Sequence, residues 1–276
     1  MDLKLRKFNM KNIAEDKVVV LIGKRETGKS FLVKDLLYHH QNVPIGTVIS
    51  GTEGANCFYG KIIPKVFIYE DYTPEIIFNF LKRQKLIKKQ IKKQEKYGKK
   101  TSDPRAFLIL DDCLYDSSWT KDKNVRSLFM NGRHYNVLFL ITMQFALGIP
   151  PNLRTNVDFI FILRETIVSN RKRLYDHWAG MFPSFEIFCQ VMNQCTEDFH
   201  CLVINNNAKS NKLEDQVFWY KAKPHNPFKL CNKRFWKIKK KHNNTDNDSS
   251  SDDDFDINSY KKKKGPRINV VRKKWE

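Results

Sequence analysis

The chain has 276 residues and carries 50 lysines and arginines against 30 aspartates and glutamates, which gives a formal net charge of +20. An excess of this size indicates a polyanionic partner, and nucleic acid is favoured over an anionic membrane surface, with simple solubility as the bland alternative. No integral membrane span is expected, because no run of about 18 uncharged apolar residues occurs, and six scattered cysteines without a C-x-x-C pair argue against a disulfide framework or a structural zinc site.

The first predicted elements are a strand, a glycine-bounded loop and a helix. Residues 1–16 are expected to form a polar lead-in, and the apolar run Val18–Ile22 predicts the first strand. The spacing G-x-x-x-x-G-K-[ST] follows and is typical of a phosphate-binding loop, in which backbone N–H groups face the phosphates. The expected nucleotide-binding residues are Gly23, Lys24, Arg25, Glu26, Thr27, Gly28, Lys29 and Ser30.

Two residues of this loop have specific expected roles. Lys29 would reach the β- and γ-phosphates of ATP as a point charge, and the Ser30 hydroxyl would bind Mg²⁺. The helix that begins at Lys29 is expected to continue to His40. Its positive N-terminal end would add to the attraction for phosphate.

A strongly basic helix is predicted after two further β-like runs, Ile45–Ser50 and Lys65–Tyr69. A helix start with proline in its first turn lies at residues 72–75. The segment Lys82–Lys100 then holds ten basic residues and the single acid Glu95. It carries only a thin apolar stripe, so it is either a solvated surface helix or a contact for nucleic acid or a neighbouring subunit.

Paired aspartates follow the next predicted strand, Ala106–Leu110, whose continuous apolar run suits a buried parallel strand. Asp111 would orient Mg²⁺, and Asp112 would polarise the attacking water. A helix over 124–131 and a strand over 137–142 come next, and Gln144 could orient water or sense the γ-phosphate. Arg133 precedes that strand and could act as an arginine finger; the competing arginines are Arg126 and Arg154.

Strands alternating with helices predict an α/β fold with a mainly parallel sheet. The remaining predicted elements are a strand at 157–163, helices at 171–178 and 185–195, and strands at 200–204 and 216–221. The expected ATPase domain is 17–242. Residues 243–276 are acidic and then basic, nearly free of aliphatic residues at first, and are expected to be a disordered tail.

Several of these motifs together resemble the virion DNA-packaging ATPases of large eukaryotic DNA viruses of the poxvirus and mimivirus type, a branch of the FtsK/HerA superfamily of P-loop ATPases. The resemblance extends from about Val18 to Tyr220. It is carried by LIGKRETGKS, VISGTE, FYGKIIPKVFIY, FLILDD, NGRHYNVLFLITMQ and PPNLRTNVDFIFILRE. It implies a RecA-like core with an additional strand between the phosphate-loop strand and the strand that bears the acids.

The resemblance also implies partners and residue roles. It implies a homo-oligomeric, hexameric ring around double-stranded DNA that works with capsid or packaging-complex proteins, in the viral factory of the host cytoplasm and in the virion. Arg133 matches the family's arginine that acts across subunits, and Gln144 matches its polar sensor. The superfamily commonly has glutamate as the second acid, whereas this chain has Asp112, so Glu53 is the alternative group for activating water.

The function expected from the sequence is an ATP-driven motor that moves viral DNA into the capsid. A DNA helicase or a segregation-type DNA pump would carry the same motor parts. A small-molecule kinase shares the loop but needs an arginine-bearing lid, which is not evident in the sequence. The last alternative is a scaffold that binds nucleotide without turnover.

Overall fold

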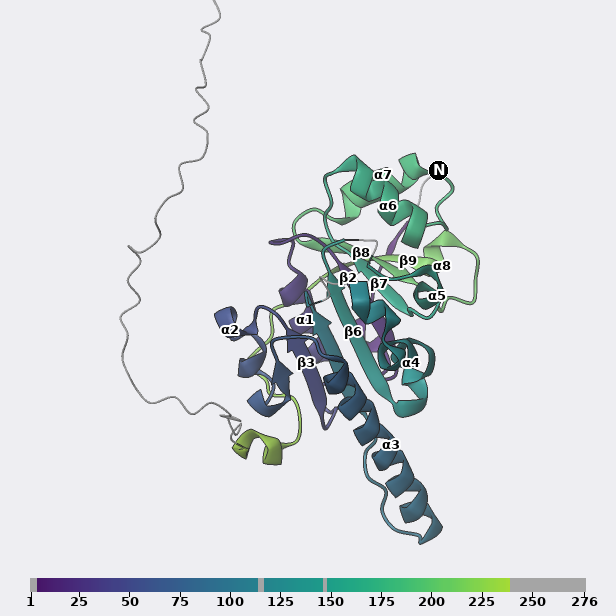
Figure 1. Ribbon diagram of the computed structural model, residues 1–276. Coiled ribbons are helices and arrows are strands. Elements are labelled where there is room, and N and C mark those ends of the chain that lie inside the picture. The colour runs from purple at the N-terminus through teal and green to yellow at the C-terminus, as the bar shows by residue number, and fades with distance from the viewer. Residues whose placement is uncertain (1–3, 114–116, 146–147, 239–276) are drawn as a thin grey trace, which may run out of the picture. The chain divides into compact units, whose positions relative to one another are not determined.

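The computed structural model describes residues 4–113, 117–145 and 148–238, which form a nine-stranded sheet with helices on both faces (Figure 1). The predicted disordered tail, 243–276, lies outside the described residues. The strands are β1 (Arg6–Lys7), β2 (Val18–Ile22), β3 (Gly46–Ser50), β4 (Ile68–Tyr69), β5 (Ala106–Asp111), β6 (Val137–Met143), β7 (Phe159–Ile162), β8 (His200–Asn205) and β9 (Val217–Lys221).

The α-helices are α1 (Lys29–Tyr38), α2 (Glu53–Asn56), α3 (Pro74–Lys96), α4 (Lys123–Asn131), α5 (Pro151–Arg154), α6 (Val168–Trp178), α7 (Phe185–Cys195) and α8 (Leu213–Gln216). Short 3-10 helices are η1 (Met10–Asn12), η2 (Tyr59–Lys61), η3 (Lys65–Phe67), η4 (Ser117–Lys121), η5 (Gly132–Tyr135) and η6 (Lys233–Lys237). None of the helices in the described ranges combines the length and the apolar character needed to cross a membrane.

The strand order is β1-β9-β8-β7-β2-β6-β5-β3-β4. All neighbouring pairs are parallel except those of β8, which is antiparallel to both β7 and β9. β6 lies between β2 and β5, which confirms the additional strand expected between the phosphate-loop strand and the acid-bearing strand. We call the edge at which β2, β3, β5, β6 and β7 end the carboxyl edge, and the edge at which they begin the amino edge.

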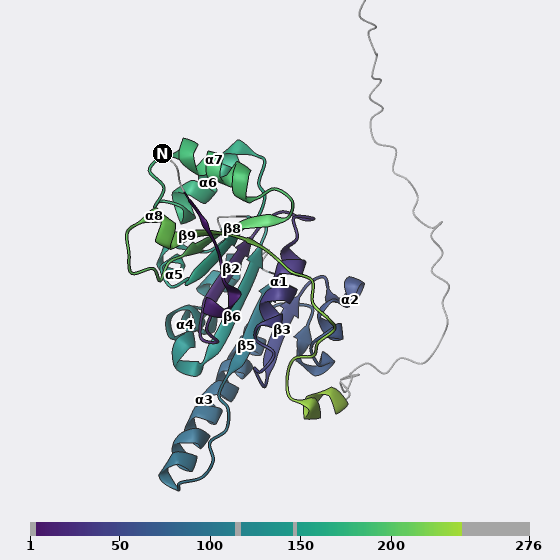
Figure 2. The same cartoon turned by 180° about the vertical axis from the view of Figure 1, so that it is seen from behind.

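The central strands are buried on both faces, as their unbroken apolar runs predict. On one face, Val18, Val20 and Ile22 join the apolar side chains of α3, α4, α6 and α7. On the other face, Val19 and Leu21 pack with α1 and with two segments near the ends of the described chain, residues 8–13 and 228–230. Figure 2 shows α1 and these outer segments from behind.

Two segments differ from the sequence expectation. In the expected polar lead-in, β1 pairs with β9, and Phe8, Met10 and Ile13 are buried in the core. The run Lys65–Tyr69 forms η3 followed by the two-residue edge strand β4. Local β-propensity could not reveal either outcome, because both depend on which neighbour is free to pair.

Helix α3 begins as predicted, with Thr73 before it and Pro74 in its first turn. Its first turns bury Ile77, Phe80 and Leu81 against the sheet. Beyond Gln84 its residues are exposed or half-buried, and the helix extends past the amino edge (Figures 1 and 2).

Candidate active site

The phosphate loop connects β2 to α1 at the carboxyl edge, and two of its glycines are sterically required. Gly28 has φ +97°, a left-handed conformation that other residues rarely adopt. A Cβ on Gly23 would lie 2.8 Å from both Leu163 Cβ and Thr27 Oγ1. The loop therefore passes too close to its surroundings for a larger residue at its start.

The ammonium group of Lys29 is held between the loop and the second aspartate. Its Nζ donates to the Gly23 carbonyl oxygen at 2.8 Å and lies 3.0 Å from Asp112 Oδ2. Lysine has three N–H donors, so one remains for a phosphate oxygen. A second lysine fixes the loop from outside, because Lys24 pairs with the buried carboxylate of Glu165 at 2.6 Å.

Asp111 and Asp112 are oriented by Thr142 on the neighbouring strand, which stands opposite Asp111 in the β5–β6 register. The Thr142 hydroxyl donates to Asp111 Oδ1 at 2.6 Å and accepts from the Asp112 N–H at 3.1 Å. Asp112 has φ +46°, and strained backbone of this kind recurs at functional sites. Burial raises the pKa of Asp111, and the hydrogen bond from Thr142 partly offsets this rise.

Gln144 joins the same group as expected, because its Nε2 lies 3.4 Å from Asp112 Oδ2. These side chains line a cavity of about 600 Å³, which we call the phosphate cavity. Its lining residues are Lys24, Arg25, Glu26, Gly28, Lys29, Ser30, Phe31, Thr52, Asn56, Asp111, Asp112, Gln144 and Phe199. The structure therefore brings most of the sequence-predicted nucleotide residues together with Asp111, Asp112 and Gln144.

The donor set fits a magnesium ion. Ser30 and Asp111 line the phosphate cavity together, and hydroxyl and carboxylate oxygens are the ligands that Mg²⁺ prefers. The Asp111 side chain is buried, and its hydrogen bond from Thr142 fixes its orientation.

Glu53, the alternative acid, has a different position. Its carboxylate accepts the backbone N–H groups of Tyr59 at 2.8 Å and Gly60 at 2.7 Å. It is buried and does not line the phosphate cavity. These contacts give Glu53 a role in fixing the turn after α2, and they leave Asp112 as the carboxylate beside Lys29.

Arg133 lies in η5, immediately before β6, and is exposed. The phosphate loop follows the end of β2, and β2 and β6 are parallel, so Arg133 stands at the amino edge, opposite the loop. Arg133 does not line the phosphate cavity, and neither do Arg126 and Arg154. An action of Arg133 on nucleotide would have to occur in a neighbouring copy of the chain.

Some residues of this region were missed in the sequence. Thr142 is the last residue of the strand expected over 137–142, and a hydroxyl near the end of an apolar strand is a usable signal for a site residue. Glu165 and Phe199 gave no such signal, because each is brought to the loop by tertiary packing alone.

The chain matches no protein-family profile. It is 41% identical over 220 residues to the uncharacterized protein L437 of Acanthamoeba polyphaga mimivirus, covering 79% of this chain and 77% of that protein. It is 43% identical over 219 residues to the uncharacterized protein 075L of Invertebrate iridescent virus 6, covering 79% of this chain and 81% of that protein.

Among solved structures, the chain is similar to B204, the DNA-packaging ATPase of Sulfolobus turreted icosahedral virus, with a TM-score of 0.51 and 16% identity over 78% of this chain and 100% of B204. The genome-packaging NTPase B204 of Sulfolobus turreted icosahedral virus 2, in complex with ATP-gammaS, gives a TM-score of 0.50 at 16% identity, covering 76% of this chain and 98% of that protein. At this identity the likeness establishes a shared fold.

Proposed function

Because the chain belongs to the family of large-DNA-virus proteins that includes L437 and 075L, we propose that it is an ATP-driven motor that moves double-stranded viral DNA into the capsid during virion assembly. The fold is that of P-loop ATPases. The observation that carries the proposal is the contact of Lys29 Nζ with Asp112 Oδ2 at 3.0 Å, which puts a phosphate-binding cation and an acid at one cavity.

In this mechanism the loop residues bind the triphosphate through their backbone N–H groups and the Lys29 ammonium. Asp112 accepts a proton from the attacking water, and Gln144, 3.4 Å from that carboxylate, orients the water. Positioning and charge neutralisation supply most of the catalysis, since phosphoryl transfer requires little covalent chemistry from the protein.

Mg²⁺ held by Ser30 and Asp111 would neutralise charge on the phosphates. Thr142 keeps the Asp111 carboxylate aimed at that position through its 2.6 Å hydrogen bond. Arg133 completes the site from a neighbouring subunit, which requires a ring or another closed homo-oligomer.

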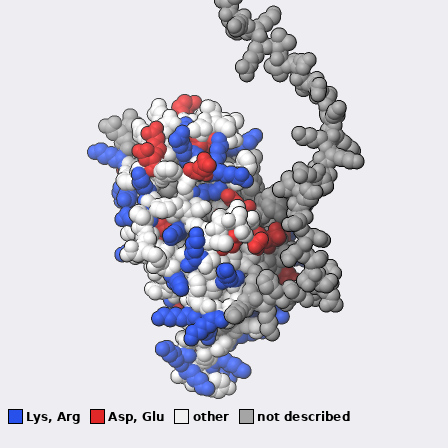
Figure 3. All heavy atoms as spheres, turned by 90° about the vertical axis from the view of Figure 1, so that its left-hand side faces the viewer, with Lys and Arg blue, Asp and Glu red and all other residues white. Residues whose placement is uncertain are grey.

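The basic arm, formed by α3 from Lys82 onward and the following residues to Lys100, supports a DNA partner. Its exposed lysines are Lys82, Lys85, Lys89, Lys92, Lys93, Lys96, Lys99 and Lys100. Among the described residues, none of them forms an ion pair. Figure 3 shows lysine and arginine atoms gathered at the end of the molecule where this arm projects. Phosphates of a duplex would neutralise that charge and release counterions.

The packaging role rests on two supports beyond the site. The relatives come from viruses with large DNA genomes. B204, which shares the fold, is the DNA-packaging ATPase of its virus. These supports favour packaging over the helicase, the segregation-type pump and the small-molecule kinase, all of which share the nucleotide chemistry.

The test is ATP hydrolysis by the full chain with and without duplex DNA at low salt. We expect duplex DNA to stimulate turnover, and Lys29→Ala to abolish it and weaken nucleotide binding greatly. If DNA leaves the turnover rate unchanged and a small phosphate acceptor is phosphorylated, the protein is a kinase and not a motor. Stimulation by DNA together with strand separation of a forked duplex would favour the helicase.

A further inference from the structure

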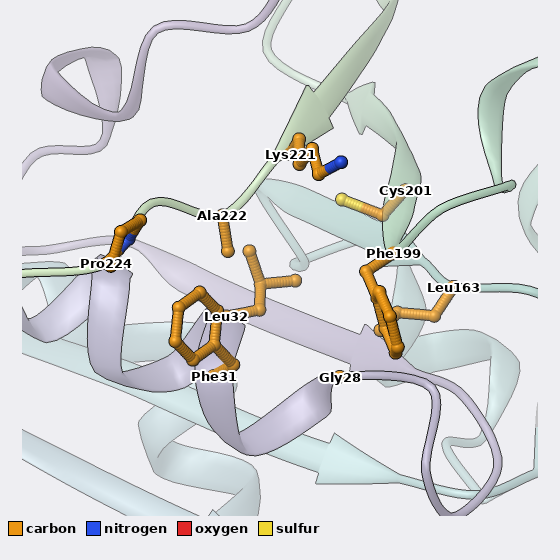
Figure 4. A pocket seen from close by; sticks show the side chains of 9 residues that line it. All are labelled: Gly28, Phe31, Leu32, Leu163, Phe199, Cys201, Lys221, Ala222 and Pro224. Atoms are coloured by element: carbon orange, nitrogen blue, oxygen red, sulfur yellow. The ribbon is translucent and has the colours of Figure 1, made fainter.

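A second cavity lies beside the phosphate cavity and has a different lining. It has a volume of about 470 Å³. Its lining residues, drawn in Figure 4, are Gly28, Phe31, Leu32, Leu163, Phe199, Cys201, Lys221, Ala222 and Pro224. Gly28, Phe31 and Phe199 line both cavities, so the two adjoin at the phosphate loop.

The sheet order places the two cavities on opposite sides of the loop. The acids and Gln144 follow β5 and β6, on one side of β2. Leu163 follows β7, and Phe199 and Cys201 lie at the start of β8, on the other side. A triphosphate whose terminal phosphate lies near Asp112 therefore points its nucleoside end toward the second cavity.

We propose that this second cavity, the base pocket, binds the purine base of the nucleotide whose phosphates occupy the phosphate cavity, with the Phe199 ring stacked on the base. The proposal rests on the proposed ATPase function and names the residues that select its substrate. The pocket is of the size usual for small-molecule sites and is mainly apolar, as base-binding sites are.

Phe199 has two features that a bound base would explain. It has φ +61°, and Asp198 before it has φ +48°, so two consecutive residues adopt a conformation that costs energy outside glycine. Phe199 is 68% exposed. Its ring nevertheless lies close to the phosphate loop, since a Cβ on Gly28 would be 3.4 Å from Phe199 Cδ1. A base stacked on this ring would remove its apolar face from water.

The opposite rim of the pocket is held rigidly by Asp35 of α1. This fully buried carboxylate accepts the Tyr220 hydroxyl at 2.6 Å, the Lys223 N–H at 3.0 Å and a hydrogen bond from His225. The His225 ring also stacks on Tyr38, with ring centroids 3.7 Å apart. Because Lys221, Ala222 and Pro224 lie within this anchored segment, the rim is ordered before a ligand binds, which favours affinity.

The lining also indicates how the base is recognised. Aromatic and aliphatic faces dominate, and Lys221 is the charged residue among the lining side chains. Contact with the flat face of the nucleotide base, rather than hydrogen bonds to the edge of the base, then determines how strongly the nucleotide binds. The substrate class is a purine nucleoside triphosphate, with ATP and GTP bound alike and pyrimidine nucleotides bound more weakly.

The experiment is calorimetric titration of the full chain with ATPγS and, separately, with inorganic tripolyphosphate, both with Mg²⁺. We expect Phe199→Ala to weaken ATPγS binding roughly 10- to 100-fold, the usual effect of losing one base–aromatic stack, and to change tripolyphosphate binding less than about twofold. Ala222→Trp, which fills the pocket from its rim, should act in the same direction. Phe78→Ala, at a half-exposed phenylalanine of α3, is the matched control and should change neither.

Unchanged ATPγS binding in both pocket variants would overturn the proposal, and so would equal losses for the two ligands, since the ring would then only support the loop. Lys29→Ala separates the two claims. It should weaken both ligands, and retention of both would contradict the proposed function while leaving the Phe199 comparison intact.

Discussion

The Asp112 carboxylate has three neighbours that define what it can do: the Lys29 ammonium, the Gln144 amide and, at 3.5 Å, the Thr142 hydroxyl. Asp112→Asn keeps the shape of the side chain and removes the group that accepts a proton in the proposed mechanism. We expect kcat for ATP hydrolysis to fall roughly 10²- to 10⁴-fold, with nucleotide affinity changed by only a few-fold. Steady-state kinetics with a separate binding titration measure the two effects.

The comparison variant is Glu53→Gln. The Glu53 carboxylate accepts hydrogen bonds from two backbone N–H groups. The glutamine side chain has only one acceptor oxygen, so one of these N–H groups is left poorly paired, and the free energy of unfolding should fall by about 1–3 kcal/mol. Turnover should persist. Loss of turnover in Glu53→Gln with retention in Asp112→Asn would exchange the roles of the two acids.

His40, just after α1, makes stability depend on pH. Burial first, and then the charges of His39 and Arg105, lower the pKa of His40 to about 4. The unfolded chain takes up a proton near the ordinary pKa of about 6.5, so this group's contribution to stability is fully present above that value and is lost as the pH falls toward 4. The free energy of unfolding should drop by about 2 kcal/mol from this group between pH 7.5 and 5.

Urea unfolding of the wild type and of His40→Leu at pH 7.5 and 5 isolates this group, because other titrating groups are common to both proteins. The wild type should lose more stability than the variant on acidification. Parallel losses would mean that the imidazole is protonated without cost inside the fold.

At the scale of elements, local sequence pattern predicted the uniformly buried strands β2 and β5 and the amphipathic helix α7. The runs Val18–Ile22 and Ala106–Leu110 are apolar throughout and form β2 and β5, and the boundaries of α7 were predicted without error. The shared carboxyl edge of β5 and β6 then brought Asp112 and Gln144 together, as parallel strands require.

Features that depend on long-range packing could not be predicted in this way. Phe8 is buried only because β1 finds a free edge at β9. The carboxylate of Asp35 is buried only because the chain after β9 returns over α1. Phe199 reaches the loop through two left-handed residues that no periodicity reveals. Each of these contacts joins residues far apart in the sequence, where composition and spacing carry no information about distance.

The basic arm gives a prediction that belongs to one element. Lys92 and Lys96 are exposed, one helical turn apart, and lie beyond the part of α3 that packs on the sheet. Lys92→Gln with Lys96→Gln should weaken binding of duplex DNA and reduce the slope of log affinity against log salt by roughly 1 for each lysine that contacts a phosphate. Fluorescence anisotropy with a labelled duplex at several salt concentrations measures this slope.

The matched control changes two exposed lysines away from the arm, Lys209→Gln with Lys212→Gln. ATP hydrolysis without DNA should be the same in both double variants, because neither pair lines the phosphate cavity. Equal slopes for the two variants would mean that the arm is only a solvated helix and that the +20 charge acts diffusely.

At the scale of the whole molecule, the sheet separates the parts of the proposed hydrolytic site. The phosphate loop and the acids lie at the carboxyl edge, and Arg133 lies at the amino edge. Arg133 is also next to the base of the arm, because Gln84 of α3 donates to the carbonyl oxygen of Tyr135, in the same 3-10 helix as Arg133, at 3.0 Å. Copies arranged carboxyl edge to amino edge would bring Arg133 of each copy to the cavity of the next. The same arrangement would bring the base of each arm close to the subunit boundary.

Mixing two inactive variants tests this arrangement. Arg133→Ala lacks the arginine that a neighbour needs, and Asp112→Asn lacks the acid of its own cavity, so each alone should bind ATP and fail to hydrolyse it. In a random one-to-one mixture, about a quarter of the interfaces pair an intact acid with an intact arginine, and up to about that fraction of wild-type turnover should return. An arginine acting within its own chain would give no rescue at any ratio, because no single chain in the mixture carries both groups.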